Sequence, residues 1–353
     1  MAPVDSGLRT RVQTELVSFL AERRGELTAI DASLDPVADA LESFILGGGK
    51  RLRPAFAYWA YRACGGPDQA ELIGAIASLE LLHAGALIHD DVMDASDTRR
   101  GEPAVHRRFA DQHAAEDWSG LSESFGRSAA ILLGDLCLVW SDEMFHGAGL
   151  PYERLAAARP YYDAMRTEVM AGQYLDVLSQ ARRDDSAEQA SRVATYKSAK
   201  YTVERPVLLG GALAGADSAL LKAFSEYGLP LGEAFQLRDD VLGVYGDPAQ
   251  TGKPSGGDLR EGKRTYLVAA AIEAGDDVQR ETLRRLLGDP GLTDDGVAIL
   301  QKIINDTGAL ARTEKRISEL TSTALGALES VELEPVAAAT LRRLATASSQ
   351  RAT

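Results

Sequence analysis

The chain has 353 residues, of which 45% are hydrophobic and 25% charged, which is enough apolar content for a large core. Its formal net charge of −14 argues against nucleic acid or an anionic membrane as a general partner, because both would repel it. Two cysteines form neither a disulfide framework nor a zinc site. With no signal peptide pattern and no apolar run of roughly 18 residues, we expect a cytoplasmic protein without a membrane segment.

Ala and Leu dominate the chain, and apolar residues recur at intervals of three and four, which is typical of helices. We see no alternating strand pattern, and no linker divides the sequence. The stretch 107–124 is the longest irregular piece and is expected to be a surface excursion. The sequence therefore predicts one all-α domain over residues 1–353. The expected helices are 7–28, 34–46, 52–64, 68–94, 124–147, 152–181, 186–214, 217–246, 263–287, 293–311, 313–330 and 334–349.

Two aspartate clusters close long apolar helical segments. In the first, Asp90 and Asp94 share a helix face with Asp91 on its flank, and the second holds Asp239 and Asp240. Unpaired buried carboxylates repel one another, and Mg²⁺ removes that cost by taking oxygen ligands. Solvated acidic faces are the simpler alternative, but both clusters lie at the ends of apolar stretches. Facing each other, the clusters would hold a diphosphate between metal ions.

Basic residues indicate the ligand. The segment Gly47–Pro54 places Lys50, Arg51 and Arg53 beside a glycine turn that opens a helix, a combination suited to a diphosphate. The alternative is a helix start with cations that extend into solvent. The segment Gly47–Pro54 is not a Walker A loop, because Arg51 stands where that motif requires Ser or Thr. Further cations, each unremarkable alone, follow at Arg99, Arg100, Lys197, Lys253 and Lys263.

Together these motifs resemble the trans-type isoprenyl diphosphate synthases, the polyprenyl synthetase family that includes farnesyl and geranylgeranyl diphosphate synthases. The resemblance runs from about residue 40 to 275 and rests on Gly48–Pro54, Asp90–Asp94 with Arg99–Gly101, Lys197–Ser198, Phe235–Asp240, Lys253 and Lys263. It implies a single large helical bundle around a central cavity. It also implies a Mg²⁺-dependent prenyltransferase, a homodimer that condenses isopentenyl diphosphate with an allylic diphosphate.

The resemblance also assigns roles to residues. About three Mg²⁺ ions per active site are implied, with Asp90, Asp94 and Asp239 as ligands and Asp91 and Asp240 in support. The implied isopentenyl diphosphate site consists of Lys50, Arg53, His83 and Arg100. The implied allylic site consists of Arg99, Lys197, Ser198, Gln236, Lys253 and Lys263.

The chain departs from the family pattern at two positions. Gly243 stands where the second motif usually carries a third aspartate, and either Asp247 or water is available to complete the coordination. Ser198 stands where threonine is usual and keeps the hydroxyl. Because the first motif is intact, the sequence still predicts an active enzyme.

The chemistry fits this resemblance. An allylic diphosphate ionises when Mg²⁺ and cationic side chains stabilise the leaving diphosphate, and the double bond of isopentenyl diphosphate then attacks the cation. A terpene cyclase is an alternative, but it does not need a second set of diphosphate-binding cations. A non-catalytic partner subunit is another, although such subunits typically lose one of these clusters.

Product length is predicted from the helix that carries the first motif. Gly85 and Ala86 lie where farnesyl synthases tend to carry an aromatic residue, so their small side chains leave the pocket open past the farnesyl stage. Leu82 shares a face with Ala86 and begins to close the pocket one turn deeper. Close helix packing is the alternative reason for the small residues. We expect geranylgeranyl diphosphate as the main product, with farnesyl or longer polyprenyl chains as alternatives.

Overall fold

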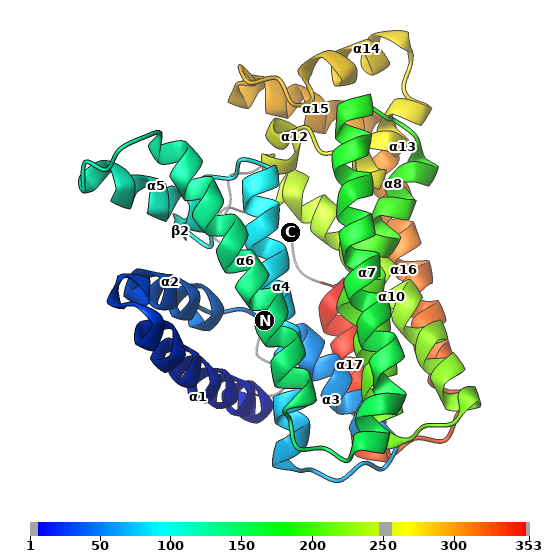
Figure 1. Ribbon diagram of the computed structural model, residues 1–353. Helices are drawn as coiled ribbons and strands as arrows, with labels where there is room; N and C mark the ends of the chain where they lie inside the picture. Colours follow the sequence, from blue (N-terminus) through cyan, green and yellow to red (C-terminus); the bar gives the residue numbers. More distant parts are fainter. Residues whose placement is uncertain (1–5, 247–255, 351–353) are drawn as a thin grey trace. The chain divides into compact units, whose positions relative to one another are not determined.

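The computed structural model describes residues 6–246 and 256–350, and helices dominate it (Figure 1). The predicted all-α class is confirmed. Contacts divide the described chain into two compact units. The N-terminal unit comprises residues 6–58 and 66–157, and the C-terminal unit comprises residues 59–65, 158–246 and 256–350. The single domain expected over residues 1–353 stays a prediction.

The elements of the first part of the chain are α1 (Ser6–Ile30), η1 (Ala32–Leu34), α2 (Asp35–Leu46), α3 (Leu52–Ala63), α4 (Ala70–Met93), β1 (Thr98–Arg99), β2 (Glu102–Pro103), α5 (Val105–Ala115), α6 (Ser122–His146) and α7 (Tyr152–Arg182). The elements that follow are α8 (Ala187–Val193), η2 (Ala194–Glu204), α9 (Arg205–Ala214), α10 (Ser218–Tyr245), α12 (Gly257–Glu261), α13 (Tyr266–Ala274), α14 (Asp277–Leu286), α15 (Asp294–Asp306), α16 (Ala309–Ala327) and α17 (Pro335–Ser349).

Helix α4 is the core of the N-terminal unit, and it packs along α6. Glycines at the interface let the two backbones approach. A Cβ at Gly85 would lie 2.9 Å from the carbonyl oxygen of Gly134, and a Cβ at Gly134 would overlap the ring of His89. That ring lies 3.0 Å from the carbonyl oxygen of Ile131. The contacts fix the end of α4 that carries the first aspartate motif.

Within the described residues, one helix is long and apolar enough to cross a membrane, and it is α4. The sequence predicts no uninterrupted apolar run of this length, because Glu80 interrupts the apolar segment. Of the apolar window in α4, 78% is buried inside the protein, as in the core helix of a globular fold. Glu80 itself is only 4% exposed and is ion-paired.

In the C-terminal unit, the core forms around α13, whose residues 266–272 are all buried together with apolar side chains of α10 and α16. The element η2 is a π-helix of 11 residues. Two glycines accommodate it, because a Cβ at Gly172 would lie 2.3 Å from the nitrogen of Lys197 and one at Gly232 would lie 2.4 Å from the oxygen of Ala199. The backbone that carries Lys197 and Ser198 therefore lies directly on α7 and α10.

Several predicted boundaries were wrong. The stretch 107–124 is not an excursion throughout, because α5 occupies residues 105–115 and buries His106, Phe109 and His113. A two-residue antiparallel pair, β1 with β2, stands where no strand was expected. The helix predicted over 263–287 is broken at Gly275 by a capping box at Asp276. The break before α16 falls at Gly308, which has a φ of +74°.

Candidate active site

The first aspartate motif lies at the carboxyl end of α4. The helix ends at Met93, and the backbone N–H of Asp94 donates to the carbonyl oxygen of Asp90 at 2.8 Å, so both carboxylates stay on one face. The side chain of Asp90 is 20% exposed, whereas that of Asp91 is 1% exposed. Asp94 is partly exposed too, so Asp90 and Asp94 are accessible enough to bind a metal ion, whereas Asp91 is buried.

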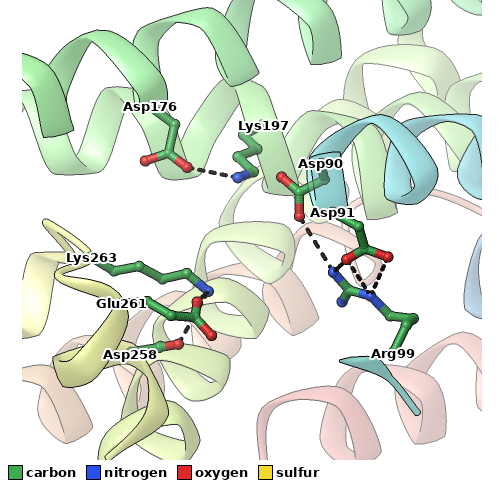
Figure 2. Close-up of polar contacts among 8 residues, drawn as sticks. All are labelled: Asp90, Asp91, Arg99, Asp176, Lys197, Asp258, Glu261 and Lys263. Atoms are coloured by element: carbon green, nitrogen blue, oxygen red, sulfur yellow. Dashed lines mark hydrogen bonds and ion pairs between the residues drawn. The ribbon is translucent and has the colours of Figure 1, made fainter. Parts of the chain in front are cut away.

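Arg99 holds the buried Asp91 carboxylate (Figure 2). Its Nε lies 2.9 Å and 3.2 Å from the two carboxylate oxygens, and its Nη2 contacts Asp91 as well. The same nitrogen is 3.7 Å from Asp90. Burial raises the pKa of Asp91, and Arg99 opposes that rise. This buried ion pair is compatible with the prediction that Asp91 supports the metal ligands and does not bind the metal itself. Arg99, predicted at the allylic diphosphate, lies here against the acidic motif.

The residues predicted for isopentenyl diphosphate gather in the N-terminal unit. Arg100 Nη1 donates to the carbonyl oxygen of Gly48 at 3.2 Å, and both Gly48 and Gly49 have a φ of +114°. Burial lowers the pKa of His83 well below its ordinary value, and the cations of Arg53 and Arg100 lower it further. His83 therefore favours its neutral form and lies among arginines. Lys50 is exposed on the same turn. Such a concentration of positive charge suits a polyanion.

Arg51, the third cation of the glycine turn, points into the core. It is 5% exposed, has a φ of +50°, and its Nη1 lies 2.5 Å from Glu80. Its Nη2 donates to Gln13 and to the carbonyl oxygen of Ile45, at 2.8 Å and 2.7 Å. Arg51 thus shapes the turn, and of the three cations beside the glycines it is the one that is turned into the core.

The second aspartate motif lies near the carboxyl end of α10. Gln236 Nε2 donates to Asp240 at 2.7 Å, and Asp240 is 4% exposed. Burial raises the pKa of Asp240 to about 8, with Gln236 opposing the rise and the charges of Asp258 and Asp239 adding to it. Asp239 is partly exposed. The motif thus pairs a partly exposed carboxylate with a buried one, and the roles of metal ligand for Asp239 and of support for Asp240 stay predictions.

Lysines are held in place by carboxylates in the C-terminal unit (Figure 2). Lys197 Nζ lies 2.6 Å from Asp176, and Lys263 Nζ lies 3.2 Å from Asp258 and 2.8 Å from Glu261. Burial alone would lower the pKa of Lys263, but these two carboxylates raise it, so the ammonium stays charged. Predicted residues Lys253 and Asp247 lie outside the described residues.

These residues fit Mg²⁺ as a cofactor. Across residues 6–246 and 256–350, no group of three or more His, Cys, Asp or Glu side chains could hold a metal ion by itself. Mg²⁺ does not need such a group, because it binds one or two carboxylates and completes its octahedron with water and substrate phosphates. The accessible carboxylates Asp90, Asp94 and Asp239 offer hard oxygen donors of this kind.

Comparison with known proteins decides the family. The model of the family described as polyprenyl synthetase matches residues 35–305. This chain belongs to the polyprenyl synthetase family.

Relatives within this polyprenyl synthetase family differ in product. A geranylgeranyl pyrophosphate synthase of Corynebacterium glutamicum, solved with isoprenyl diphosphate and magnesium, is 40% identical with a TM-score of 0.94, over 98% of this chain and 99% of that one. A geranylfarnesyl diphosphate synthase of Aeropyrum pernix is 35% identical over 80% of this chain and 83% of its own length. A (2E,6E)-farnesyl diphosphate synthase of Mycobacterium tuberculosis is 32% identical over 74% of this chain and 68% of its own length.

The residues predicted to set product length differ in how far they are buried. Gly85 faces α6, where a Cβ would also lie 3.2 Å from Cys137, so the structure supports close packing as the reason for this glycine. Ala86 is partly exposed, and Leu82 is fully buried. Of the two small residues, Ala86 is the one whose side chain is not enclosed by the interface with α6.

Sequence reasoning missed the carboxylates that orient the lysines, namely Asp176, Asp258 and Glu261. Asp176 lies 21 positions before Lys197, and no local spacing links the two residues. Asp258 and Glu261 lie five and two positions before Lys263, so a search for carboxylates around each predicted cation would have found them. These partners hold the ammonium groups in place before a ligand arrives.

Proposed function

We propose that this chain is a Mg²⁺-dependent geranylgeranyl diphosphate synthase that adds isopentenyl diphosphate to an allylic diphosphate. As a member of the polyprenyl synthetase family it is a trans-prenyltransferase. The observation that carries condensation is the basic group in which the charges of Arg53 and Arg100 act on His83, with Lys50 on the adjoining glycine turn. A terpene cyclase needs no such second diphosphate-binding group.

Each side chain has a proposed part. Asp90, Asp94 and Asp239 supply carboxylate oxygens for Mg²⁺, which when bound stabilises the charge that develops on the departing diphosphate. Lys197 and Lys263, held by their carboxylate partners, add positive charge to the same group.

The remaining predicted residues complete the substrate assignments. The isopentenyl diphosphate is assigned to Lys50, Arg53, His83 and Arg100. The positive charges of the lysine and the two arginines hold it for attack on the allylic cation. Arg99, Ser198, Gln236 and Lys253 remain proposed ligands of the allylic diphosphate.

The reaction is tested by incubating the enzyme with labelled isopentenyl diphosphate and, separately, dimethylallyl, geranyl and farnesyl diphosphate. The expected product from each primer is geranylgeranyl diphosphate, made only with Mg²⁺. Products that stop at the farnesyl stage or pass beyond it would contradict the product assignment. A hydrocarbon product would contradict the reaction itself.

We further propose a homodimer in the cytoplasm. Helix α6 exposes Ile131, Leu132 and Val139 to 48%, 63% and 63%, which is unusual for large apolar side chains on one helix. Light scattering should give a dimer, and Leu132→Asp with Val139→Asp should give a monomer. Val278→Asp, at a 75% exposed position on α14, is the control that should leave the dimer intact. A monomeric wild-type enzyme would refute the proposal.

A further inference from the structure

Gly243 marks an unusual place on α10. It lies four positions after Asp239 and three after Asp240, so it faces the same side of the helix as the second motif. The family resemblance puts a third aspartate at this position, and this chain has no side chain there. The missing carboxylate would be one turn beyond Asp239.

Another carboxylate fills the space at this position. A Cβ built on Gly243 would lie 1.9 Å from Oδ2 of Asp258, 2.4 Å from its Cγ and 3.0 Å from its Oδ1. Contacts below 3.0 Å are essentially never seen for a real Cβ, so any side chain at position 243 would displace Asp258. The glycine and the aspartate therefore form a matched pair.

Asp258 reaches this position from a different element. It belongs to α12, which follows Gly256 with a φ of +73°, and its side chain is 14% exposed. Oδ1 accepts from Lys263 Nζ at 3.2 Å, while Oδ2 is the atom nearest to Gly243. The backbone N–H of Lys263 also donates to the carbonyl oxygen of Asp258, at 3.0 Å. One carboxylate thus joins the lysine of the site to the face of α10 that carries the motif.

We propose that Asp258 supplies the third carboxylate of the second aspartate motif in place of residue 243, and that Gly243 is required to admit it. This inference rests on the proposed function. Asp258 acts as a positioning residue, since it fixes the Lys263 ammonium and sets negative charge one turn beyond Asp239. Mg²⁺ binding with diphosphate therefore depends on Asp258, and an aspartate at position 243 would push the Asp258 carboxylate out of this place.

The test is a double-mutant cycle with Gly243→Asp, Asp258→Ala and the double variant. Calorimetric Mg²⁺ binding in the presence of inorganic diphosphate is the readout, with thermal unfolding as a check on the fold. Loss of a group that supports a metal ligand typically weakens metal binding about 10–100-fold, and each single variant should lose affinity on this scale. The double variant should regain most of the lost affinity, because its single aspartate occupies the position without a clash.

A matched control is Gly326→Asp on α16, where a Cβ would meet nothing within 4 Å, and it should bind Mg²⁺ like the wild type. Wild-type affinity in Asp258→Ala, or losses that simply multiply in the double variant, would overturn the inference. The readout involves no prenyl transfer, so a failure of the proposed reaction would be visible separately, as normal Mg²⁺ and diphosphate binding without a prenyl product.

Discussion

Removing the Glu80 carboxylate should destabilise the fold strongly. Its side chain and that of Arg51 are both 4% exposed and lie 2.5 Å apart, so Glu80→Ala leaves a buried guanidinium with one hydrogen-bonding partner fewer. Breaking a buried pair from one side costs about 3–5 kcal/mol. For 353 residues at about 2.1 cal/mol/K each, the unfolding entropy is roughly 0.7 kcal/mol/K, which converts that cost into a drop of about 4–7 °C in the unfolding midpoint.

The assay for Glu80→Ala is thermal unfolding followed by circular dichroism. The control is Asp306→Ala, which also removes a carboxylate 2.5 Å from its cation, but from an exposed pair in which Lys302 is 74% exposed. Ion pairs on the surface contribute little to the free energy of unfolding, so the unfolding midpoint of Asp306→Ala should fall by about 1 °C or less. Replacing both buried partners, as Arg51→Met with Glu80→Leu, should recover much of the stability. Equal shifts for Glu80→Ala and Asp306→Ala would refute the structural role assigned to Arg51.

The other predictions concern activity. Asp90→Ala and Asp239→Ala should each lower turnover roughly 10²–10³-fold while the helical circular dichroism signal persists, and full activity in excess chelator would contradict the metal assignment. Arg53→Lys should raise the Michaelis constant for isopentenyl diphosphate about tenfold or more and leave that for the allylic substrate nearly unchanged, since an ammonium cannot form a bidentate contact. Equal effects on both Michaelis constants would argue against the assignment of Arg53 to the isopentenyl diphosphate site. Ala86→Phe should make farnesyl diphosphate the main product, and an unchanged distribution of chain lengths in an active variant would show that α4 does not set the length.

Much of the site could be predicted because its chemistry is local in sequence. The helical spacing of Asp90 and Asp94 places both on one face, and the structure keeps them there at the end of α4. The inward direction of Asp91 could not be predicted, because it depends on Arg99 returning to it through the short β1–β2 pair. Charge alone likewise gave no sign that Arg51 has a partner in Glu80, 29 positions away.

The missed features have two physical causes. Helix α5 was predicted as irregular because its buried face includes His106 and His113, which weaken the apolar pattern that indicates a helix. The close approach of the Asp258 carboxylate to Gly243 depends on where α12 folds relative to α10, and no sequence pattern specifies that contact. Partners of this kind depend on tertiary structure, whereas motif spacing reports only on the local helix.

The most direct test of the central claim is mass spectrometry of the product formed from farnesyl diphosphate and ¹³C-labelled isopentenyl diphosphate. With Mg²⁺, the proposed function predicts one linear geranylgeranyl diphosphate that carries a single labelled unit and retains the diphosphate of isopentenyl diphosphate. With excess chelator, both substrates should be recovered unchanged. A cyclic hydrocarbon, or no condensation product in the presence of Mg²⁺, would contradict the claim that this chain is a trans-prenyltransferase acting on two diphosphates.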